Sequence, residues 1–319
     1  MMKCVAIVGP TASGKTALGV ALASLLGGEV VNCDSMQIYK YMNIGTAKPT
    51  EEEMRGVKHH MLDFLSPCES FSAEAYREGA MAAISDISSR GRLPVIVGGT
   101  GLYLDTLLRK PMLTVEASSP EFRERILSQI KDENDRHRLW QRLLEIDPAS
   151  AEKIHENNVK RVIRAIEVYE TTGKPKSYWD EQTRLEKSEL DAGIIVLDFH
   201  QRETLYDRID RRVDLMFDKG LLSEVEELYS QGYLREPTTA SSAIGYKELV
   251  SYIMGECTLE EAKEKIKLSS RRYAKRQLTW FRHEENAITL YVDDESGALR
   301  PIEQIAEEAT HIATDFLKE

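Results

Sequence analysis

The sequence predicts an α/β fold, in which a parallel sheet carries helices on both faces and a helical domain is inserted into the core. Strand and helix patterns alternate over the first part of the chain, which is typical of such a sheet. Strand patterns vanish between about residues 111 and 190 and then return. We therefore expect a catalytic core of residues 1–110 plus 191–319 and a helical insertion domain of residues 111–190.

The elements of the first core segment follow from their apolar patterns. Strands are expected at 4–8, 29–33, 59–64 and 93–97, and helices at 17–26 and 72–90. The last of these strands closes at a glycine-rich turn that begins with Gly98.

Amphipathic helices fill the predicted insertion, and the core then resumes. Helices are expected at 120–131, 135–145 and 159–172, and the last of them is stopped by Gly173 and Pro175. A strand returns at 194–197, helices (including 202–219) continue to about 284, and a final strand at 287–292 precedes a C-terminal helix.

Composition excludes several classes of protein. With 42% hydrophobic and 30% charged residues, the chain is an ordinary globular protein. No apolar run approaches the length of a membrane span, and a core strand begins at the N-terminus, so we expect a cytoplasmic protein without membrane contact. Four cysteines without C-x-x-C spacing indicate reduced thiols and no zinc site. We expect a monomer.

Charge is unevenly distributed along the chain. The net charge of −11 argues against a protein that coats nucleic acid. Residues 269–282, however, hold five basic side chains and no acid. This segment favours a local docking site for a nucleic acid.

A phosphate-loop motif carries the first chemical signal. It consists of Gly9, Pro10, Thr11, Ala12, Ser13, Gly14, Lys15 and Thr16, between an apolar strand and a helix. Backbone N–H groups and the helix N-terminus attract a polyphosphate, Lys15 adds a full charge, and the Thr16 hydroxyl is placed to hold Mg²⁺. The alternative is a glycine-rich turn that only caps a helix, but both flanks favour a P-loop NTPase-like sheet that binds a di- or triphosphate.

Two further motifs end strands at the same edge of the sheet. Asp34 follows the second strand and Thr100 follows the strand at 93–97, so both should lie near the phosphate loop. Asp34 can hold Mg²⁺ through water or accept a proton, or it can cap a helix. The place where a hydrolase carries its Mg²⁺-binding acid holds glycine, and the guanine-reading N-K-x-D pattern is missing. Both absences weaken the hydrolase and GTPase interpretations.

Two helices carry candidate contacts to ligands. Arg208 and Arg212 share a helix face and can grip a diphosphate, or they form a solvated charged face with neighbouring aspartates. Tyr273, Gln277 and Trp280 form a stripe among basic residues, which suits RNA or, equally, a core-facing stripe with a basic outer face.

Taken together, the motifs resemble those of the tRNA dimethylallyltransferases, also called tRNA isopentenyltransferases. The resemblance covers nearly the whole chain, through GPTASGKT, DSMQIYKYMNIGTAKPT (34–50), GGTGLYL (98–104), VKRVIRAIEVYETTGKP (159–175), SSAIGYKEL (241–249) and RRYAKRQLTWFR (271–282). DSMQIY followed by IGTAKP is highly specific. One departure is Lys160, where the family often has glutamine, and no C-terminal zinc finger of the eukaryotic type is present. The chain is therefore similar to the bacterial type.

The resemblance implies transfer of a dimethylallyl group from dimethylallyl diphosphate to N6 of the adenosine just 3′ of the anticodon, position 37 of tRNA. It implies that Asp34 is the general base, that Thr100 lines the channel for a flipped base, and that Lys15, Thr16 and Arg212 stabilise the diphosphate with Mg²⁺. The expected contacts to the tRNA anticodon stem-loop are Asp34, Ser35, Met36, Gln37, Thr100, Arg123, Lys160, Arg161, Arg164, Gly245, Tyr246, Arg272, Lys275, Arg276, Gln277, Trp280 and Arg282.

Three alternatives remain at this point. An adenylate isopentenyltransferase would share the loop but take a free nucleotide, and a P-loop nucleoside kinase would use ATP as donor. A P-loop RNA-binding protein without catalysis is the third. The insertion and the basic helix disfavour the first, and Asp34 with Thr100 beside the loop disfavours the last.

Overall fold

The computed structural model describes residues 1–109, 120–186, 188–236, 238–284 and 286–318. The chain forms two compact units, one of Met1–Leu108 with Glu189–Glu319 and the other of Arg109–Ser188. These bounds differ by a few residues from those expected from the sequence. Residues 111–119 of the expected insertion lie outside the described residues.

A parallel six-stranded sheet with the order β3-β2-β4-β1-β5-β6 forms the centre of the first unit. Its strands are β1 (Met2–Val8), β2 (Glu29–Asn32), β3 (His59–His60), β4 (Pro94–Gly98), β5 (Leu190–Asp198) and β6 (Ile288–Tyr291). The central strands β1 and β4 are almost wholly buried, because helices cover both faces. The predicted fold class is confirmed.

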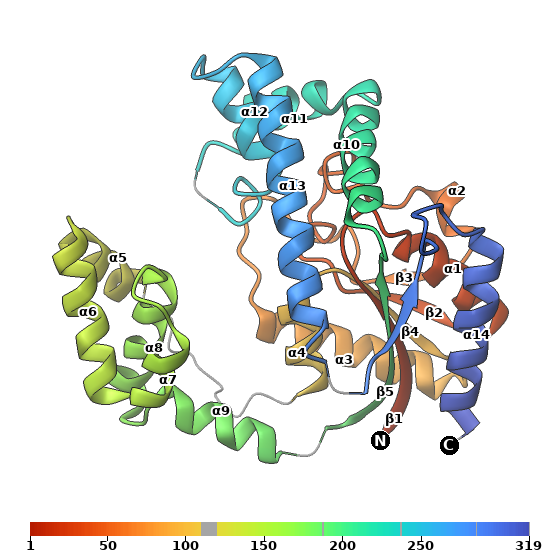
Figure 1. The fold of residues 1–319 in the computed structure, drawn as a ribbon, viewed down its shortest axis with the longest axis horizontal. Helices are drawn as coiled ribbons and strands as arrows, with labels where there is room; N and C mark the ends of the chain where they lie inside the picture. The colour runs from red at the N-terminus through yellow and green to blue at the C-terminus, as the bar shows by residue number, and fades with distance from the viewer. Residues whose placement is uncertain (110–119, 187, 237, 285, 319) are drawn as a thin grey trace. The chain divides into compact units, whose positions relative to one another are not determined.

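Helices pack on each face of the sheet (Figure 1). The helices of the first unit are α1 (Lys15–Leu25), α2 (Glu51–Met54), α3 (Ala73–Ser89), α4 (Gly101–Leu108), α10 (Arg202–Asp218), α11 (Leu221–Ser230), α12 (Tyr246–Ile253), α13 (Leu259–Phe281) and α14 (Ile302–Lys318). One apolar cluster joins Leu18 of α1 and Ile305 of α14 to the sheet, and a second joins Ile84 of α3 and Leu104 of α4 to its other face.

A third apolar cluster lies among helices α10 to α13. Tyr246 of α12 and Leu221 of α11 pack in it against Ile38 and Met42, which follow β2 in the chain. Figure 1 shows α11 and α12 beside one end of the long helix α13. This cluster supports the segment that follows Asp34. The candidate site lies at the same edge of the sheet.

The third strand is much shorter than the expected strand at 59–64. It ends at His60 because Met61 and Asp63 have φ angles of 57°, in the left-handed region that a strand cannot use. Helix α4, which the sequence did not predict as a helix, starts directly after the glycine-rich turn at residue 101.

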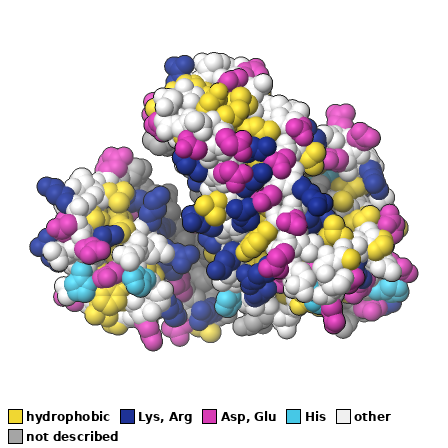
Figure 2. Space-filling model, turned by 45° about the horizontal axis from the view of Figure 1, so that its top comes forward, with side chains coloured by type: hydrophobic (Ala, Val, Ile, Leu, Met, Phe, Trp, Pro, Cys, Tyr) yellow, Lys and Arg dark blue, Asp and Glu magenta, His cyan; other side chains and the backbone are white. Residues whose placement is uncertain are grey.

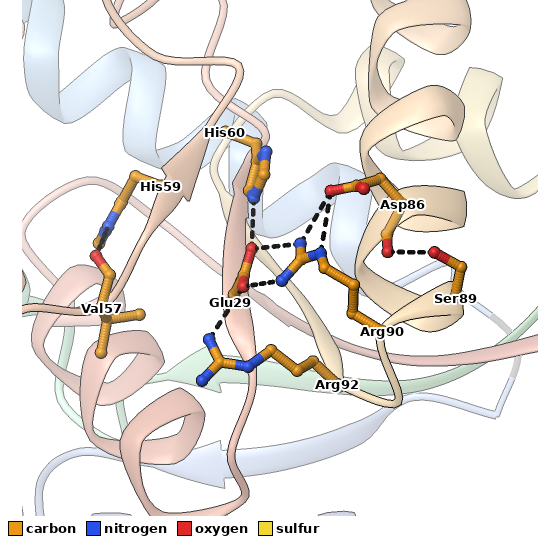
Figure 3. Close-up of polar contacts among 8 residues, drawn as sticks. All are labelled: Glu29, Val57, His59, His60, Asp86, Ser89, Arg90 and Arg92. Carbon is orange, nitrogen blue, oxygen red and sulfur yellow. Dashed lines mark hydrogen bonds and ion pairs between the residues drawn. The ribbon is translucent and has the colours of Figure 1, made fainter.

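The start of β2 is fixed by an ion-pair cluster around a buried glutamate. Glu29 is 1% exposed, and its carboxylate accepts hydrogen bonds from Arg90 and from Arg92, the latter at 2.9 Å. His60 Nε2 lies 2.7 Å from Glu29 Oε2 (Figure 3). Asp86 also binds Arg90. The cluster joins β2, β3 and the turn that precedes β4.

The second unit is helical and has an apolar core of its own. It contains α5 (Pro120–Gln129), α6 (Glu133–Ile146), α7 (Pro148–Lys153), α8 (Val159–Thr172) and α9 (Lys176–Leu185). Leu143 of α6 packs with Val162 and Ile166 of α8. The sequence predicted α5, α6 and α8 but neither α7 nor α9. In the described part of the chain, no helix is long and apolar enough to cross a membrane.

Candidate active site

A cavity of about 410 Å³ lies at the carboxyl ends of β1, β2 and β4, which are neighbours in the sheet. Its walls include the phosphate loop, the turn after β2, the end of β4 and the inner sides of α10 and α13. This is the edge at which ligands bind in open parallel sheets. All of its lining residues belong to the first unit.

The phosphate loop is held from outside by side chains of distant elements. Arg208 Nε of α10 donates to the Ala12 carbonyl at 2.8 Å, and Gln277 Oε1 of α13 accepts from the Thr11 N–H at 2.8 Å. Gly14 begins α1 with a φ of 92°, which glycine adopts without strain. The N–H groups of Gly14, Lys15 and Thr16 have no hydrogen-bond partner among the described residues. They are free to bind an anion.

Two cations of the cavity wall are poised for an anionic ligand. Lys15 Nζ donates to the Pro10 carbonyl at 2.6 Å, and burial, together with the nearby Arg212 charge, lowers the pKa of Lys15 to about 7. Burial also lowers the pKa of Arg212, while the Asp34 charge opposes this shift. Within the described chain, the Arg212 guanidinium has no hydrogen bond and no close ion pair. A diphosphate would supply the missing counter-charge.

Asp34 and Thr100 follow the paired strands β2 and β4 at the same edge of the sheet. One Asp34 oxygen, Oδ1, accepts the Met36 N–H at 2.9 Å, which is the turn-capping role considered from sequence. No described residue donates to Oδ2, so this oxygen is available to a ligand. Thr100 Oγ1 accepts the Ser35 N–H at 2.9 Å and donates to Ser35 Oγ at 3.2 Å. Asp34, Ser35, Met36 and Gln37 all line the cavity, and Thr100 adjoins it through Ser35.

Tyr273 is a cavity residue that sequence reasoning did not select for the site. Burial raises the pKa of its hydroxyl and the Asp34 charge adds to this, whereas a hydrogen bond with Thr100 lowers it. Its phenol is therefore within hydrogen-bonding reach of Thr100, and Asp34 is near enough to act on it electrostatically. The spacing of Tyr273, Gln277 and Trp280 indicated that the three side chains share one face of a helix. It did not show that this face points inward.

The segment after Asp34 is fastened by a glutamate that the sequence did not reveal. The Glu224 carboxylate accepts the N–H groups of Asn43, Ile44 and Gly45 and the hydroxyl of Tyr246 at 2.7 Å. Gln37 Nε2 donates to the carbonyls of residues 46 and 47. Nothing in the local sequence distinguishes Glu224 from the other glutamates of α11.

Several residues expected to contact tRNA also have structural roles. Tyr246 is fully buried and supports the 43–45 segment, while Gly245 is buried at the start of α12. Gln277 is 5% exposed, with both ends of its amide bound to backbone groups. Trp280 lies over Gly101, where a Cβ would come within 2.5 Å of the indole. These residues contribute to packing, and Gly245, Tyr246 and Gln277 also line the cavity.

The outer face of α13 keeps exposed cations. Arg272, Lys275 and Arg276 are exposed, and Arg276 lies 5.5 Å from the ring centroid of Tyr273. Arg282 is half-exposed but forms an ion pair of 3.1 Å with Asp198. Figure 2 shows basic and acidic side chains intermixed over the face in view. A local group of exposed cations therefore indicates a nucleic-acid contact better than the overall charge does.

The basic residues expected to act in the insertion fall into two pairs. Lys160 and Arg161 are exposed at the start of α8. Arg123 and Arg164 instead bind the buried Glu167, at 3.0 and 2.9 Å. Burial raises the pKa of Glu167, but the hydrogen bonds from these two arginines outweigh it and lower the pKa. Arg123 and Arg164 therefore help to hold the second unit together.

The cavity fits a divalent cation only in company with a phosphate ligand. Thr16 lines it with a hydroxyl that has no partner among the described residues. No cluster of three or more His, Cys, Asp or Glu side chains suited to a metal occurs within those residues. Mg²⁺ commonly binds through one or two protein oxygens plus substrate phosphates, and Thr16 suits that arrangement.

The parallel sheet and the phosphate loop define a P-loop protein. A sequence profile described as IPP transferase matches residues 37–284, and the chain belongs to this family. A tRNA dimethylallyltransferase of Caldanaerobacter subterraneus subsp. tengcongensis is 48% identical over 92% of this chain and 93% of its own. Another, from Geobacillus thermodenitrificans, is 51% identical over 88% of each chain.

Solved structures agree with this assignment. The tRNA isopentenylpyrophosphate transferase of Bacillus halodurans has a TM-score of 0.73 at 41% identity, covering 100% of this chain and 98% of its own. A eukaryotic dimethylallyltransferase acting on tRNA has a TM-score of 0.82 at 30% identity, covering 100% of this chain and 80% of its own.

Proposed function

We propose that this protein transfers a dimethylallyl group from dimethylallyl diphosphate to N6 of the adenosine at position 37 of tRNA, just 3′ of the anticodon. The observation that carries the proposal is a single cavity lined by both a phosphate loop and Asp34. A donor diphosphate and an acceptor amine can therefore meet there. The names of the relatives, which are tRNA dimethylallyltransferases, supply the two substrates.

The chemistry is a substitution at C1 of the prenyl group. The N6 lone pair forms a bond to C1 as the bond from C1 to the diphosphate oxygen breaks, and its electron pair leaves with the diphosphate. Asp34 Oδ2 accepts the N6 proton, which gives N6-isopentenyladenosine and diphosphate. Lys15 and Arg212 stabilise the charge that grows on the leaving group, assisted by the free N–H groups at the start of α1.

Thr16 would hold Mg²⁺ together with the diphosphate oxygens. When bound, Mg²⁺ neutralises charge on the leaving group. The rest of the phosphate loop, Gly9 to Gly14, shapes the cradle, and Arg208 acts on it through the Ala12 carbonyl. Arg208 thus maintains the shape of the phosphate loop and adds to its positive electrostatic potential.

The acceptor base must leave its stack to reach C1, as in other enzymes that modify a base. Thr100 and the residues from Ser35 to Gln37 would position the flipped adenine. The exposed cations Arg272, Lys275 and Arg276 of α13 and Lys160 and Arg161 of α8 are suited to phosphates of the anticodon stem-loop.

Transfer of label tests the proposal. Dimethylallyl diphosphate labelled in the prenyl group is incubated with Mg²⁺, the protein and either unmodified tRNA or adenosine monophosphate. The proposal expects label in tRNA alone. Label in the free nucleotide would indicate an adenylate isopentenyltransferase. ATP-dependent phosphorylation of a nucleoside, with no prenyl transfer, would indicate a kinase and overturn the proposal.

A further inference from the structure

Gln277 is the one side chain of α13 that joins the phosphate loop to the turn after β4, within the part of the chain that is described. Its Oε1 accepts the Thr11 N–H at 2.8 Å, and its Nε2 donates to the Gly99 carbonyl at 2.8 Å. The side chain is 5% exposed, so these bonds are shielded from water. A buried amide with both ends bonded fixes the distance between the two backbones it joins.

Because Gly99 has no side chain, it leaves room for this amide. A Cβ at residue 99 would lie 2.2 Å from Gln277 Nε2, a separation that real side chains do not tolerate. The nearest atom outside Gln277 would be the Gly9 carbonyl oxygen, at an ordinary 3.5 Å. Glycine at position 99 is therefore required mainly by the Gln277 amide. The pairing gives a physical reason for the second glycine of the turn, where a hydrolase has its acid.

The two backbone segments that Gln277 joins lie on the donor side and on the acceptor side of the cavity. Thr11 lies in the loop that would cradle the diphosphate, and Gly99 precedes Thr100, which holds the segment beginning at Ser35. One turn earlier on the same face of α13, Tyr273 forms a hydrogen bond with Thr100 and lies within electrostatic range of Asp34. The inner face of α13 thus contacts both the donor side and the acceptor side of the cavity.

We propose that Gln277 is a positioning residue that holds the phosphate loop in its diphosphate-binding shape, with Gly99 as its receptor, and is not a contact to tRNA. This inference rests on the proposed function and deepens it. The Gln277 carboxamide acts through the Thr11 N–H, which turns the loop toward α13 and leaves the N–H groups of residues 14–16 for the ligand. Loss of the amide lets the loop relax, so donor affinity falls while tRNA docking on the outer face of α13 persists.

Three variants test this assignment. Gln277→Met keeps the length of the side chain but removes both hydrogen bonds, Gly99→Ala expels the amide, and the double variant combines them. Thr279→Ala, an exposed position on the same helix, is the control. Affinity for inorganic diphosphate with Mg²⁺ is measured by calorimetry, tRNA affinity by filter binding, and KM and kcat for transfer from dimethylallyl diphosphate in steady state.

Each single variant should weaken diphosphate binding roughly tenfold, as expected for loss of a buried hydrogen-bonded amide. The KM for the donor should rise by a similar factor, and tRNA affinity should stay within about twofold of the parent, well below the tenfold effect on the donor. The double variant should be little worse than either single one, because both changes remove the same pair of hydrogen bonds. Thr279→Ala should match the parent.

Opposite outcomes separate the possibilities. Unchanged diphosphate affinity in Gln277→Met overturns the inference, and a fall in tRNA affinity alone would make Gln277 an acceptor contact. Additive effects in the double variant would show that Gln277 and Gly99 act independently, which contradicts the proposed pairing. Gln277→Leu, which also removes both hydrogen bonds without adding charge, gives the same readout if the Met variant does not fold. A parent protein that binds no diphosphate would instead refute the proposed function itself.

Discussion

The hydroxyl of Thr100 accepts a hydrogen bond of 2.9 Å from the backbone N–H of Ser35. This hydrogen bond joins two motifs that lie 65 residues apart in the chain. Because β2 and β4 are neighbours in the parallel sheet, their carboxyl ends bring Asp34 and Thr100 to one side of the cavity. The acceptor side of the site is therefore built by the topology of the sheet.

Donor binding should be linked to uptake of a proton by Lys15. Its pKa in the free protein is lowered to about 7, chiefly by burial, and a diphosphate would raise it again. Affinity should thus be full below pH 7 and fall as pH rises above 7. Calorimetry with dimethylallyl diphosphate between about pH 7.5 and 9, in buffers of different ionisation heat, should detect up to about one proton taken up. Lys15→Gln should abolish this uptake, and a pH-independent affinity in the parent would contradict the assignment.

The exposed cations of α13 should control tRNA affinity through salt-dependent binding to phosphates. Arg272→Ala with Arg276→Ala should weaken tRNA binding and flatten the salt slope by roughly 0.7 to 0.9 for each phosphate that is no longer neutralised. Lys263→Ala with Arg271→Ala is the charge-matched control, because these cations are paired with Asp214 and Asp210 on α10. Equal slopes in the two double variants would mean that net charge, and not this surface, sets the affinity.

The Glu29 cluster should stabilise the core in a pH-dependent way. Hydrogen bonding from Arg90 is the main cause that lowers the pKa of Glu29, with His60 and Arg92 assisting against burial. A lowered carboxyl pKa stabilises the fold above the unfolded value of about 4.3 and loses this effect as pH falls. Glu29→Gln should cost about 1 to 3 kcal/mol at neutral pH, since its partners are partly exposed. Urea unfolding should show a steady difference above about pH 5 that shrinks as pH falls below about 4. A difference that stayed constant over this acid range would contradict the linkage.

The helical insertion should be separable from the core. Replacing residues 115–188 with a short linker should leave a folded protein that binds dimethylallyl diphosphate, because the second unit has its own apolar cluster and β5 begins at Leu190. Transfer to tRNA should be abolished by removal of Lys160 and Arg161. Circular dichroism and the label-transfer assay check both points. Modification of tRNA at the parent rate, or failure of the deletion variant to fold, would refute a two-domain division.

Sequence patterns predicted the elements whose chemistry is local. The phosphate loop, the long amphipathic helices and the apolar strands all carry their signal within a few residues, and Ser72 caps α3 at the residue where the helix was expected to begin. Helix α7 was missed because six residues hold too little periodicity. The truncated β3 depends on left-handed residues that only the fold imposes.

Side-chain roles at the site were harder to predict, because they depend on contacts between distant elements. Asp34 and Lys15 could be selected from motifs alone. The inward orientation of Gln277 depends on Thr11 and Gly99, far away in the chain, and its spacing suited an RNA-binding stripe equally well. The role of Glu224 depends on three N–H groups of a distant segment, so no local pattern reveals it.

The most direct measurement is the single-turnover rate of prenyl transfer to tRNA by the parent protein and by Asp34→Asn. The asparagine oxygen can still accept the Met36 N–H that Asp34 accepts at 2.9 Å, so the turn should keep its shape. We expect the label at N6 of the adenosine at position 37, a rate lower by about 10² to 10⁴ in the variant, and nearly unchanged tRNA affinity. A variant that kept nearly the full rate would show that the Asp34 carboxylate only caps a turn.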